Sequence, residues 1–186
     1  MAGFFARWLS DVVRVGLPLA FALAAMQVPA VAHGYAAALL QIAEDARRDI
    51  EQRKAAARQH YRGAGTSDEA VVSALRAVEP ANAQALEASV ERARALRAAH
   101  ERIGAAHPLL RPVTALADAA GEARGDKWAV LRTALDTHAP QIALTGAAAA
   151  YGLIGLVFGS FFAELIVSAG GAFRSSRRGR AGGFAG

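Results

Sequence analysis

Two ionisable side chains interrupt the most apolar parts of the chain, which makes them the first candidates for chemistry. Arg14 lies in the run VVRVGLPLAFALAAMQVP, and Glu164 follows the run PQIALTGAAAAYGLIGLVFGSFFA. Charges inside a bilayer are costly, and they usually pair with one another at functional sites. Counted inward from Pro29 and Pro140 at about 1.5 Å of rise per residue, Arg14 lies about 22 Å and Glu164 about 36 Å along its helix. We therefore predict no direct pair, with Glu164 at the cytoplasmic interface.

The other reactive residue types show no spacing that catalysis or metal binding requires. The chain has no cysteine, which excludes disulfides, thiolate metal sites and cysteine nucleophiles. It also has no HExxH motif, Walker loop, dinucleotide-binding fingerprint or GxSxG elbow. No recognisable carboxylate cluster adjoins any of the five histidines, which are His33, His60, His100, His107 and His138. We predict no catalytic residue, no metal site and no cofactor, and we place a membrane enzyme last among the candidate classes.

Composition favours long helices that contact lipid. Apolar residues make up 54% of the chain, above the roughly 45 to 50% of ordinary soluble domains. Many of them are alanine, a strong helix former, whereas β-branched and aromatic residues are sparse. Because the charged share is ordinary, the apolar excess must be clustered. These features predict an all-α membrane protein.

The net charge of +5 does not indicate a nucleic-acid-binding protein, because most of it lies beside the apolar runs. Residues 33–140 hold fifteen Lys and Arg against fourteen Asp and Glu. The two ends hold six Arg against two acids, Asp11 and Glu164. This distribution is typical of membrane topology, and we expect no nucleic-acid partner.

Two segments are long enough to cross a bilayer, which takes about 20 mostly apolar residues. The first is 12–30, in which Pro18 is expected to cause a kink. The second is 140–168, where Pro140 suits the first turn of a helix. We predict a transmembrane helix over each range, in contact with membrane lipids.

The basic tail sets the predicted topology. Residues 169–186 contain no acid and carry four arginines, Arg174, Arg177, Arg178 and Arg180. Since cytoplasmic flanks of membrane helices are rich in Lys and Arg, we predict a flexible cytoplasmic tail. Two spans then return residues 1–11 to the cytoplasm and place the central segment, 31–139, on the extracytoplasmic side.

A cleaved signal peptide is an alternative interpretation of the amino terminus. Arg7 and Arg14, the apolar run that follows, and Ala30-Val31-Ala32 resemble a leader with a cleavage site after Ala32. The product would be a secreted precursor with a carboxy-terminal anchor. Asp11 is unusual in a basic leader and Pro29 crowds the site, so we favour an uncleaved anchor.

The central segment is predicted to form a helical hairpin or short coiled coil. One helix is expected from Ala30 to about Tyr61. After a glycine-containing break, Thr66 and Glu69 match a capping box that starts a short helix, and a long helix follows from Pro80 to Ile103, closed by Gly104. The two long helices carry apolar stripes at three- and four-residue steps: Tyr35, Leu39, Ile42, Ala46, Ile50 and Ala57 on the first, and Leu86, Val90, Ala93, Leu96, Ala99 and Ile103 on the second.

The remaining central residues are predicted to form solvated faces and short helices. Charged residues between the apolar positions of the first long helix alternate in sign, which is typical of a solvent-exposed face. A short helix is expected over 113–120, followed by an amphipathic helix that contains Trp128. Trp128 is suited to the membrane surface, since its ring is largely apolar and its N–H is polar.

Small residues on the second span predict a close helix contact. Gly155 and Gly159 form a GxxxG motif, and Ala148 and Gly152 continue the small-xxx-small pattern on an adjoining track. Such residues let another backbone approach. The expected partner is either the first span, through Gly16, Ala20 and Ala24, or another copy of the chain.

Two groups of residues resemble an uncharacterised family of bacterial inner-membrane proteins known only as a domain of unknown function. One group is Gln27-Val28-Pro29 with Tyr35; the other is Ala139-Pro140, Thr145, Gly146, Tyr151-Gly152, Gly155 and Gly159. The resemblance implies a small two-span bacterial membrane protein and supplies no activity, ligand or catalytic residue. The alanine-rich middle and the arginine tail do not match.

These patterns favour a structural or interaction subunit of the bacterial inner membrane. Its helices are expected to pack on a partner complex or on other copies, as a homo-oligomer or within a larger assembly. A small oligomeric transporter or pore component is the alternative, although the second span lacks the polar stripe that a pore normally needs.

Overall fold

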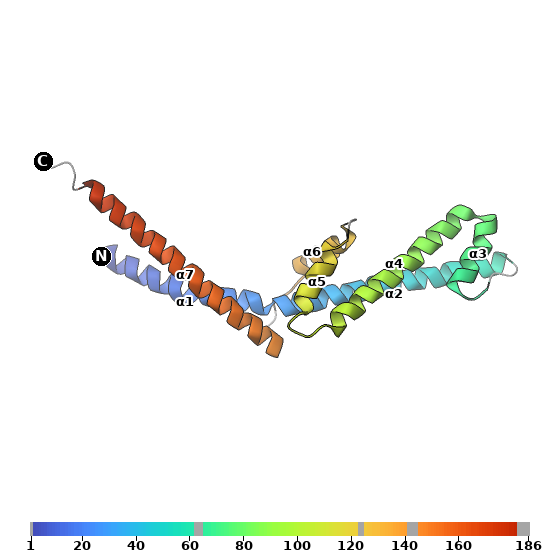
Figure 1. Ribbon diagram of the computed structural model, residues 1–186, viewed down its shortest axis with the longest axis horizontal. Coiled ribbons are helices and arrows are strands. Elements are labelled where there is room, and N and C mark those ends of the chain that lie inside the picture. Colours follow the sequence, from blue (N-terminus) through green and yellow to red (C-terminus); the bar gives the residue numbers. More distant parts are fainter. Residues whose placement is uncertain (1, 62–64, 123–124, 141–144, 182–186) are drawn as a thin grey trace. The chain divides into compact units, whose positions relative to one another are not determined.

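The computed structural model describes residues 2–61, 65–122, 125–140 and 145–181 (Figure 1). Every regular element among these residues is a helix, which confirms the predicted all-α fold. The chain divides into two compact units. The two-helix unit comprises residues 1–30 and 139–186, and the central unit comprises residues 31–138.

The two-helix unit is formed by α1 (Ala2–Met26) and α7 (Gly146–Ala181), which pack antiparallel. Gly152 of α7 lies against Met26 of α1, and Gly159 lies against Pro18, so residue numbers rise along one helix as they fall along the other. Each helix includes a stretch long enough and apolar enough to cross a membrane.

The observed bounds of these helices differ from the predicted spans. Pro140 is not helical; α7 begins at Gly146, where the hydroxyl oxygen of Thr145 accepts a hydrogen bond from the N–H of Ala148 at 3.1 Å. A threonine at this position can satisfy one of the free N–H groups of the first turn. The helix then continues to Ala181, so the segment predicted as a flexible tail from residue 169 is helical to that point.

The amino-terminal span also has a different end. A turn at Gln27 separates α1 from α2 (Val28–His60), and Pro29 lies in the first turn of α2. Proline is tolerated there because the N–H groups of a first turn have no partner within the helix. The predicted first span therefore combines α1 with the start of α2.

The central unit contains the predicted helical hairpin. Its long helices, α2 and α4 (Pro80–Ala105), run antiparallel: His100 Nδ1 lies 2.9 Å from the carbonyl oxygen of Ala36, and Arg97 bonds Glu44 at 3.3 Å. The predicted stripe of α4 is fully buried. In the stripe of α2, Ile42 and Ala46 are partly buried and the other four residues are buried.

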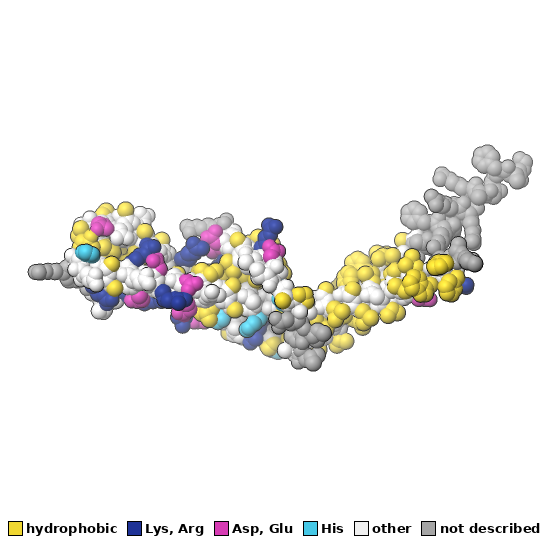
Figure 2. Space-filling model, turned by 180° about the vertical axis from the view of Figure 1, so that it is seen from behind, with side chains coloured by type: hydrophobic (Ala, Val, Ile, Leu, Met, Phe, Trp, Pro, Cys, Tyr) yellow, Lys and Arg dark blue, Asp and Glu magenta, His cyan; other side chains and the backbone are white. Residues whose placement is uncertain are grey.

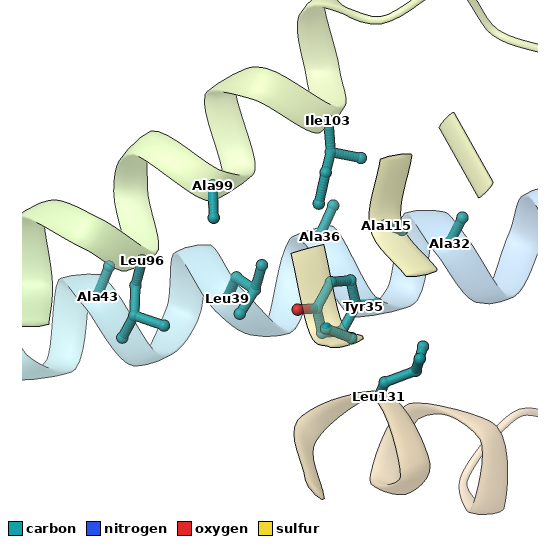
Figure 3. Packing of buried hydrophobic residues seen from close by; sticks show 11 residues of the cluster. Ala32, Tyr35, Ala36, Leu39, Ala43, Leu96, Ala99, Ile103, Ala115 and Leu131 are labelled. Atoms are coloured by element: carbon teal, nitrogen blue, oxygen red, sulfur yellow. The ribbon is translucent and has the colours of Figure 1, made fainter. Parts of the chain in front are cut away.

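Three shorter helices complete two apolar clusters along this hairpin. At one end α3 (Asp68–Val78) packs between the long helices through Val71, Val72 and Leu75. At the other end α5 (Arg111–Ala120) and α6 (Asp126–Asp136) pack on the first turns of α2. Figure 3 shows this second cluster, in which Tyr35, Leu39, Ile103 and Leu131 come together from different helices.

Two predicted helix ends in the central unit are wrong by one or two residues. The N-cap of α3 is Ser67, whose hydroxyl accepts from the N–H of Ala70, and not Thr66. Asp68 thereby becomes the first residue of the helix. Gly104 lies inside α4, which ends one residue later at Ala105. Glycine destabilises a helix interior only modestly, so the helix can continue past Gly104 for one more residue.

Candidate functional site

The packing of the two-helix unit is inverted relative to that of a water-soluble protein: on α7, small residues are buried and large apolar residues are exposed. In the part of α7 whose side chains are described, up to residue 169, the buried residues are all small: Ala148, Gly152, Gly155, Gly159 and Ala163. The exposed residues of the same helix include nine large apolar ones: Leu153, Ile154, Leu156, Val157, Phe158, Phe161, Phe162, Leu165 and Ile166. Figure 2 shows mainly hydrophobic side chains on the described surface of this unit, whereas Lys, Arg, Asp and Glu are spread over the central unit. Water does not favour this arrangement, but lipid does, because helix pairs in lipid associate through small residues.

The glycines of α7 bring its backbone into direct contact with α1. A Cβ atom on Gly155 would lie 2.4 Å from the carbonyl oxygen of Phe21, and one on Gly159 would lie 2.6 Å from Cα of Pro18. A Cβ on Gly152 would meet the side chain of Met26 at 2.8 Å, with the nearest backbone atom of α1, the carbonyl oxygen of Ala22, at an ordinary contact distance of 3.7 Å. The contact therefore requires glycine most strictly at Gly155 and Gly159. The three predicted glycines of α7 lie in this contact, and the fourth predicted small residue, Ala148, is buried.

The predicted partner residues on α1 do not lie there. Gly16, Ala20 and Ala24 are exposed on α1, and a Cβ on Gly16 would have nothing within 4 Å. The surface of α1 that meets α7 contains larger residues, including Pro18 and Phe21. Ala25 also lies on this surface, against Gly155, so the part of α1 opposite the glycines combines large and small residues. Phe21 also stacks on Phe162 with 5.6 Å between ring centroids.

Arg14 and Glu164 form a direct ion pair, contrary to the prediction. Nε of Arg14 lies 3.0 Å from Oε1 of Glu164, and its terminal nitrogen donates to Oε2 at 3.3 Å. The prediction failed because it measured depth from Pro29 and Pro140, which do not face each other. Gly152 faces Met26, and Arg14 and Glu164 each lie twelve residues from that level along their helices, or roughly 18 Å. The packing register brings them together.

Removal of one partner of this pair is expected to weaken the α1–α7 contact in lipid. Glu164→Gln should cost about 0.6–2 kcal/mol, the range for interhelical hydrogen bonds in membranes. Because the chain has no cysteine, dyes can be placed at Leu9→Cys and Ile166→Cys, and energy transfer between them followed as SDS is added to mixed micelles. The swap of Arg14→Glu with Glu164→Arg should restore much of the loss, and Arg7→Gln should have little effect. A swap no better than the single variants would exclude a specific pair.

A second charged cluster lies inside the central unit, around Asp68. Asp68 accepts hydrogen bonds from Arg47 at 2.7 Å and from Lys54 at 2.8 Å, and a longer one from Arg94 at 3.4 Å. Lys54 also bonds Glu51 at 3.0 Å. Lys54 is only 3% exposed and Asp68 only 8%. The prediction that the charged residues of α2 form a solvated face is therefore wrong for Lys54, because the start of α3 covers this part of the helix.

The cluster shifts the pKa values of both buried partners in the direction that favours their charged forms. Burial opposes the charge of Asp68, but the hydrogen bonds from Lys54 and Arg47 outweigh it and lower the pKa of Asp68 below its ordinary value. Burial likewise opposes the charge of Lys54, yet the hydrogen bonds to Asp68 and Glu51 raise its pKa above the usual lysine value. Both groups therefore stay ionised near neutral pH.

A similar arrangement surrounds Asp118 on α5. Its carboxylate accepts hydrogen bonds from the Tyr35 hydroxyl at 2.9 Å, from Arg102 at 2.9 Å and from Lys127 at 3.0 Å. The Asp118 side chain is 7% exposed. This one carboxylate therefore connects α2, α4, α5 and α6, as Asp68 connects α2, α3 and α4. Neither cluster was predicted. The one available signal was that Asp68 and Asp118 sit at or near apolar helix faces.

The carboxylates of Asp68 and Asp118 are both occupied by side-chain partners. Among the residues that the structure describes, no group of three or more His, Asp or Glu residues could hold a metal ion. No buried side-chain nitrogen or oxygen in the described parts lacks a hydrogen-bond partner. A groove of about 280 Å³ beside α4 and α6 has charged walls that include Glu91, Arg92 and Lys127. The geometry of both carboxylate clusters is that of structural clamps.

Comparison with curated proteins and with solved structures gives no significant match. A family model, in contrast, covers nearly the whole chain. It matches residues 9–176, a range that contains α2 to α6 and most of α1 and α7. This chain therefore belongs to the family described as "Protein of unknown function (DUF2937)".

Proposed function

We propose that the protein is a structural or interaction subunit of the bacterial inner membrane, anchored by α1 and α7. The single observation that carries the proposal is the inverted packing of these helices. On α7 the buried residues are glycine and alanine, whereas residues such as Phe158 and Leu165 face outward at more than half exposure. Exposed apolar area of this extent marks a surface that contacts lipid or another protein. Helices packed in this way fit a lipid bilayer.

The amino-terminal helix is proposed to remain part of the mature protein. Cleavage after Ala32 would cut inside α2, at a residue that is only 4% exposed and packs in the cluster with Tyr35. It would also remove α1, the helix on which the glycines of α7 pack. The basic residues at both ends support cytoplasmic termini. Of the four tail arginines, Arg174, Arg177, Arg178 and Arg180, the side chains lie outside the described part.

The central unit is suited to presenting a fixed surface on the extracytoplasmic side. Its two long helices are clamped to the shorter ones by Asp68 and Asp118, and the buried hydrogen-bonding groups of the described part are satisfied. Buried polar networks that are fully satisfied make a fold more rigid. A rigid helical unit on a membrane anchor supports a role in assembly, in which it binds a partner complex or other copies of the chain.

The proposal predicts an uncleaved, membrane-embedded chain that does not act alone. Full-length protein should resist extraction by alkaline carbonate, and its intact mass should include residues 1–32, which cleavage after Ala32 would remove. After crosslinking in native membranes, light scattering in detergent should give a mass well above that of one chain. A matched sample of the Gly155→Leu variant should lose the compact anchor and serve as the control.

Two outcomes would contradict this proposal. Release by carbonate would remove the membrane anchor, and a lone monomer without captured partners would remove the interaction role. Ion or solute flux in liposomes that disappears in Glu164→Gln would favour the transporter alternative, because the Arg14–Glu164 pair is the charged site within the described α1–α7 contact.

A further inference from the structure

We propose that the exposed apolar faces of α5 and α6 lie in the membrane surface, at the boundary between lipid headgroups and acyl chains. This inference depends on the proposed membrane anchoring by α1 and α7. In addition to α1 and α7, the central unit itself would then contact the membrane. The occupant of these faces is the lipid bilayer that the same chain crosses.

The first argument is the inverted side-chain size in α5. Its buried face consists of Pro112, Ala115 and Ala119. Its exposed residues include Val113 at 59% and Leu116 at 52% exposure. A surface helix in water normally turns its large apolar residues inward. In α5, as in α7, the larger residues face outward, which indicates a second apolar environment on that side.

The second argument is the position of the exposed apolar residues within the central unit. Among the described residues of this unit, the large exposed hydrophobic side chains are Val78, Leu109, Leu110, Val113, Leu116, Trp128 and Leu135. All except Val78 lie in α5, in α6 or in the turn before α5. The end of the hairpin that α3 covers has an otherwise ordinary polar exterior. The exposed apolar surface of the described central unit is therefore concentrated on α5, α6 and the turn before α5, and we expect its partner to bind there.

The third argument is the short chain distance from these helices to the membrane anchors. Ala32, which packs in one cluster with Ala115, Ala119 and Leu131, lies only six residues after Met26, the last residue of α1. Six residues reach at most about 22 Å even when fully extended. At the other end, α6 finishes at Asp136, ten residues before α7 begins at Gly146. The chain that connects these helices to the anchors is therefore short at both junctions.

The residue types also fit a lipid surface. Trp128 and Leu135 are seven residues apart on α6, so they share one face of the helix, and both are about half exposed. Tryptophan is enriched at membrane interfaces, where its ring contacts acyl chains and its N–H remains in the headgroup region. A lipid surface accepts such side chains without matching their shape. A helix of this kind lies in the plane of the interface.

Fluorescence quenching tests the proposal in the full chain, because the protein has two tryptophans, Trp8 and Trp128. The Trp8→Phe variant leaves Trp128 as the reporter, and Trp128→Phe leaves Trp8 in α1. In nanodiscs, lipids with a spin label near the headgroup should quench both reporters to a similar extent. Lipids labelled at the end of the acyl chain should quench Trp128 less than the headgroup-labelled lipids do. If Trp8 alone is quenched, anchoring stands and this inference fails; if neither is quenched, the proposed anchoring itself fails.

Spin labels extend the test to α5, with Val78 as the matched control. Labels at Val113→Cys and Leu116→Cys should be severalfold more accessible to oxygen, relative to a water-soluble nickel reagent, than a label at Val78→Cys, which is 60% exposed on α3. Equal nickel accessibility at all three positions would overturn the proposal. Protection from both reagents with spin–spin coupling would show a second copy on this face and would overturn it as well.

Discussion

Gly155→Ala is expected to destabilise the α1–α7 pair more than the same change at the other glycines that face α1. The added Cβ would lie 2.4 Å from the carbonyl oxygen of Phe21 and 2.7 Å from Cβ of Ala25. A backbone oxygen cannot rotate out of the way, so the helices must separate along much of their contact. Overpacking of this kind costs about 1–3 kcal/mol. We expect the upper part of that range, and Gly155→Leu should abolish the contact.

The remaining glycines give a graded series with an internal control. Gly159→Ala should cost slightly less, because its Cβ would meet Cα of Pro18 at 2.6 Å, and Gly152→Ala less again, because the Met26 side chain can move. Gly16→Ala should be neutral or stabilising by up to about 1 kcal/mol, since glycine weakens a helix interior and nothing lies within 4 Å of its Cβ.

The dyes at positions 9 and 166 measure this series by the SDS fraction at which energy transfer is lost. From the highest SDS midpoint to the lowest, the expected order is Gly16→Ala, Gly152→Ala, Gly159→Ala and Gly155→Ala. Equal midpoints for Gly155→Ala and Gly16→Ala would show that α1 and α7 do not pack in this register. A uniform gain in all four variants would point to helix propensity and not to the contact.

Sequence periodicity predicted the elements whose formation depends on local spacing. The stripe of α4 from Leu86 to Ile103 was identifiable because large and small apolar residues recur every three or four positions, and all six members are buried. The small-residue face of α7 was identifiable for the same reason. In both cases the helix period alone determines which residues share a face.

The misjudged features depend on how two helices are aligned, which spacing does not encode. The Arg14–Glu164 pair follows from the level at which Gly152 meets Met26, and that register is set by side chains on both helices. The burial of Lys54 likewise depends on where α3 folds back on α2. Lys54 has charged neighbours at helical spacing and therefore resembles a solvated residue until the carboxylate of Asp68 is placed beside it.

Asp68→Asn is expected to have the largest effect on the central unit. It removes the carboxylate from a lysine that is 3% exposed and leaves Lys54 with Glu51 as its remaining anionic partner. Breaking a buried ion pair by removing one partner typically costs about 3–5 kcal/mol. Urea denaturation of the full chain in detergent, followed by helical circular dichroism, should show the transition of the central unit at much lower urea.

Two variants separate the buried pair from ordinary surface charge. Replacing both partners, with Asp68→Leu and Lys54→Met, should recover a large part of the stability, because apolar residues of similar volume often substitute well for a buried pair. Glu69→Gln, which loses an exposed bond to Arg94, should leave the urea transition nearly unchanged, because exposed ion pairs contribute little to stability. A double variant as unstable as Asp68→Asn would mean that the site requires polar side chains for another reason.

The same pair predicts how the stability of the central unit depends on pH. Because the pKa of Asp68 is lowered in the folded state, its contribution is present above the ordinary value of 3.8 and is lost as pH falls through the lower folded value. The pKa of Lys54 is raised, so its contribution is present below 10.5 and is lost as pH rises through the folded value. Wild-type protein should therefore lose urea resistance below pH 3.8, and Asp68→Asn should lose much less over that range. An identical acid dependence in both proteins would show that another carboxylate controls acid unfolding.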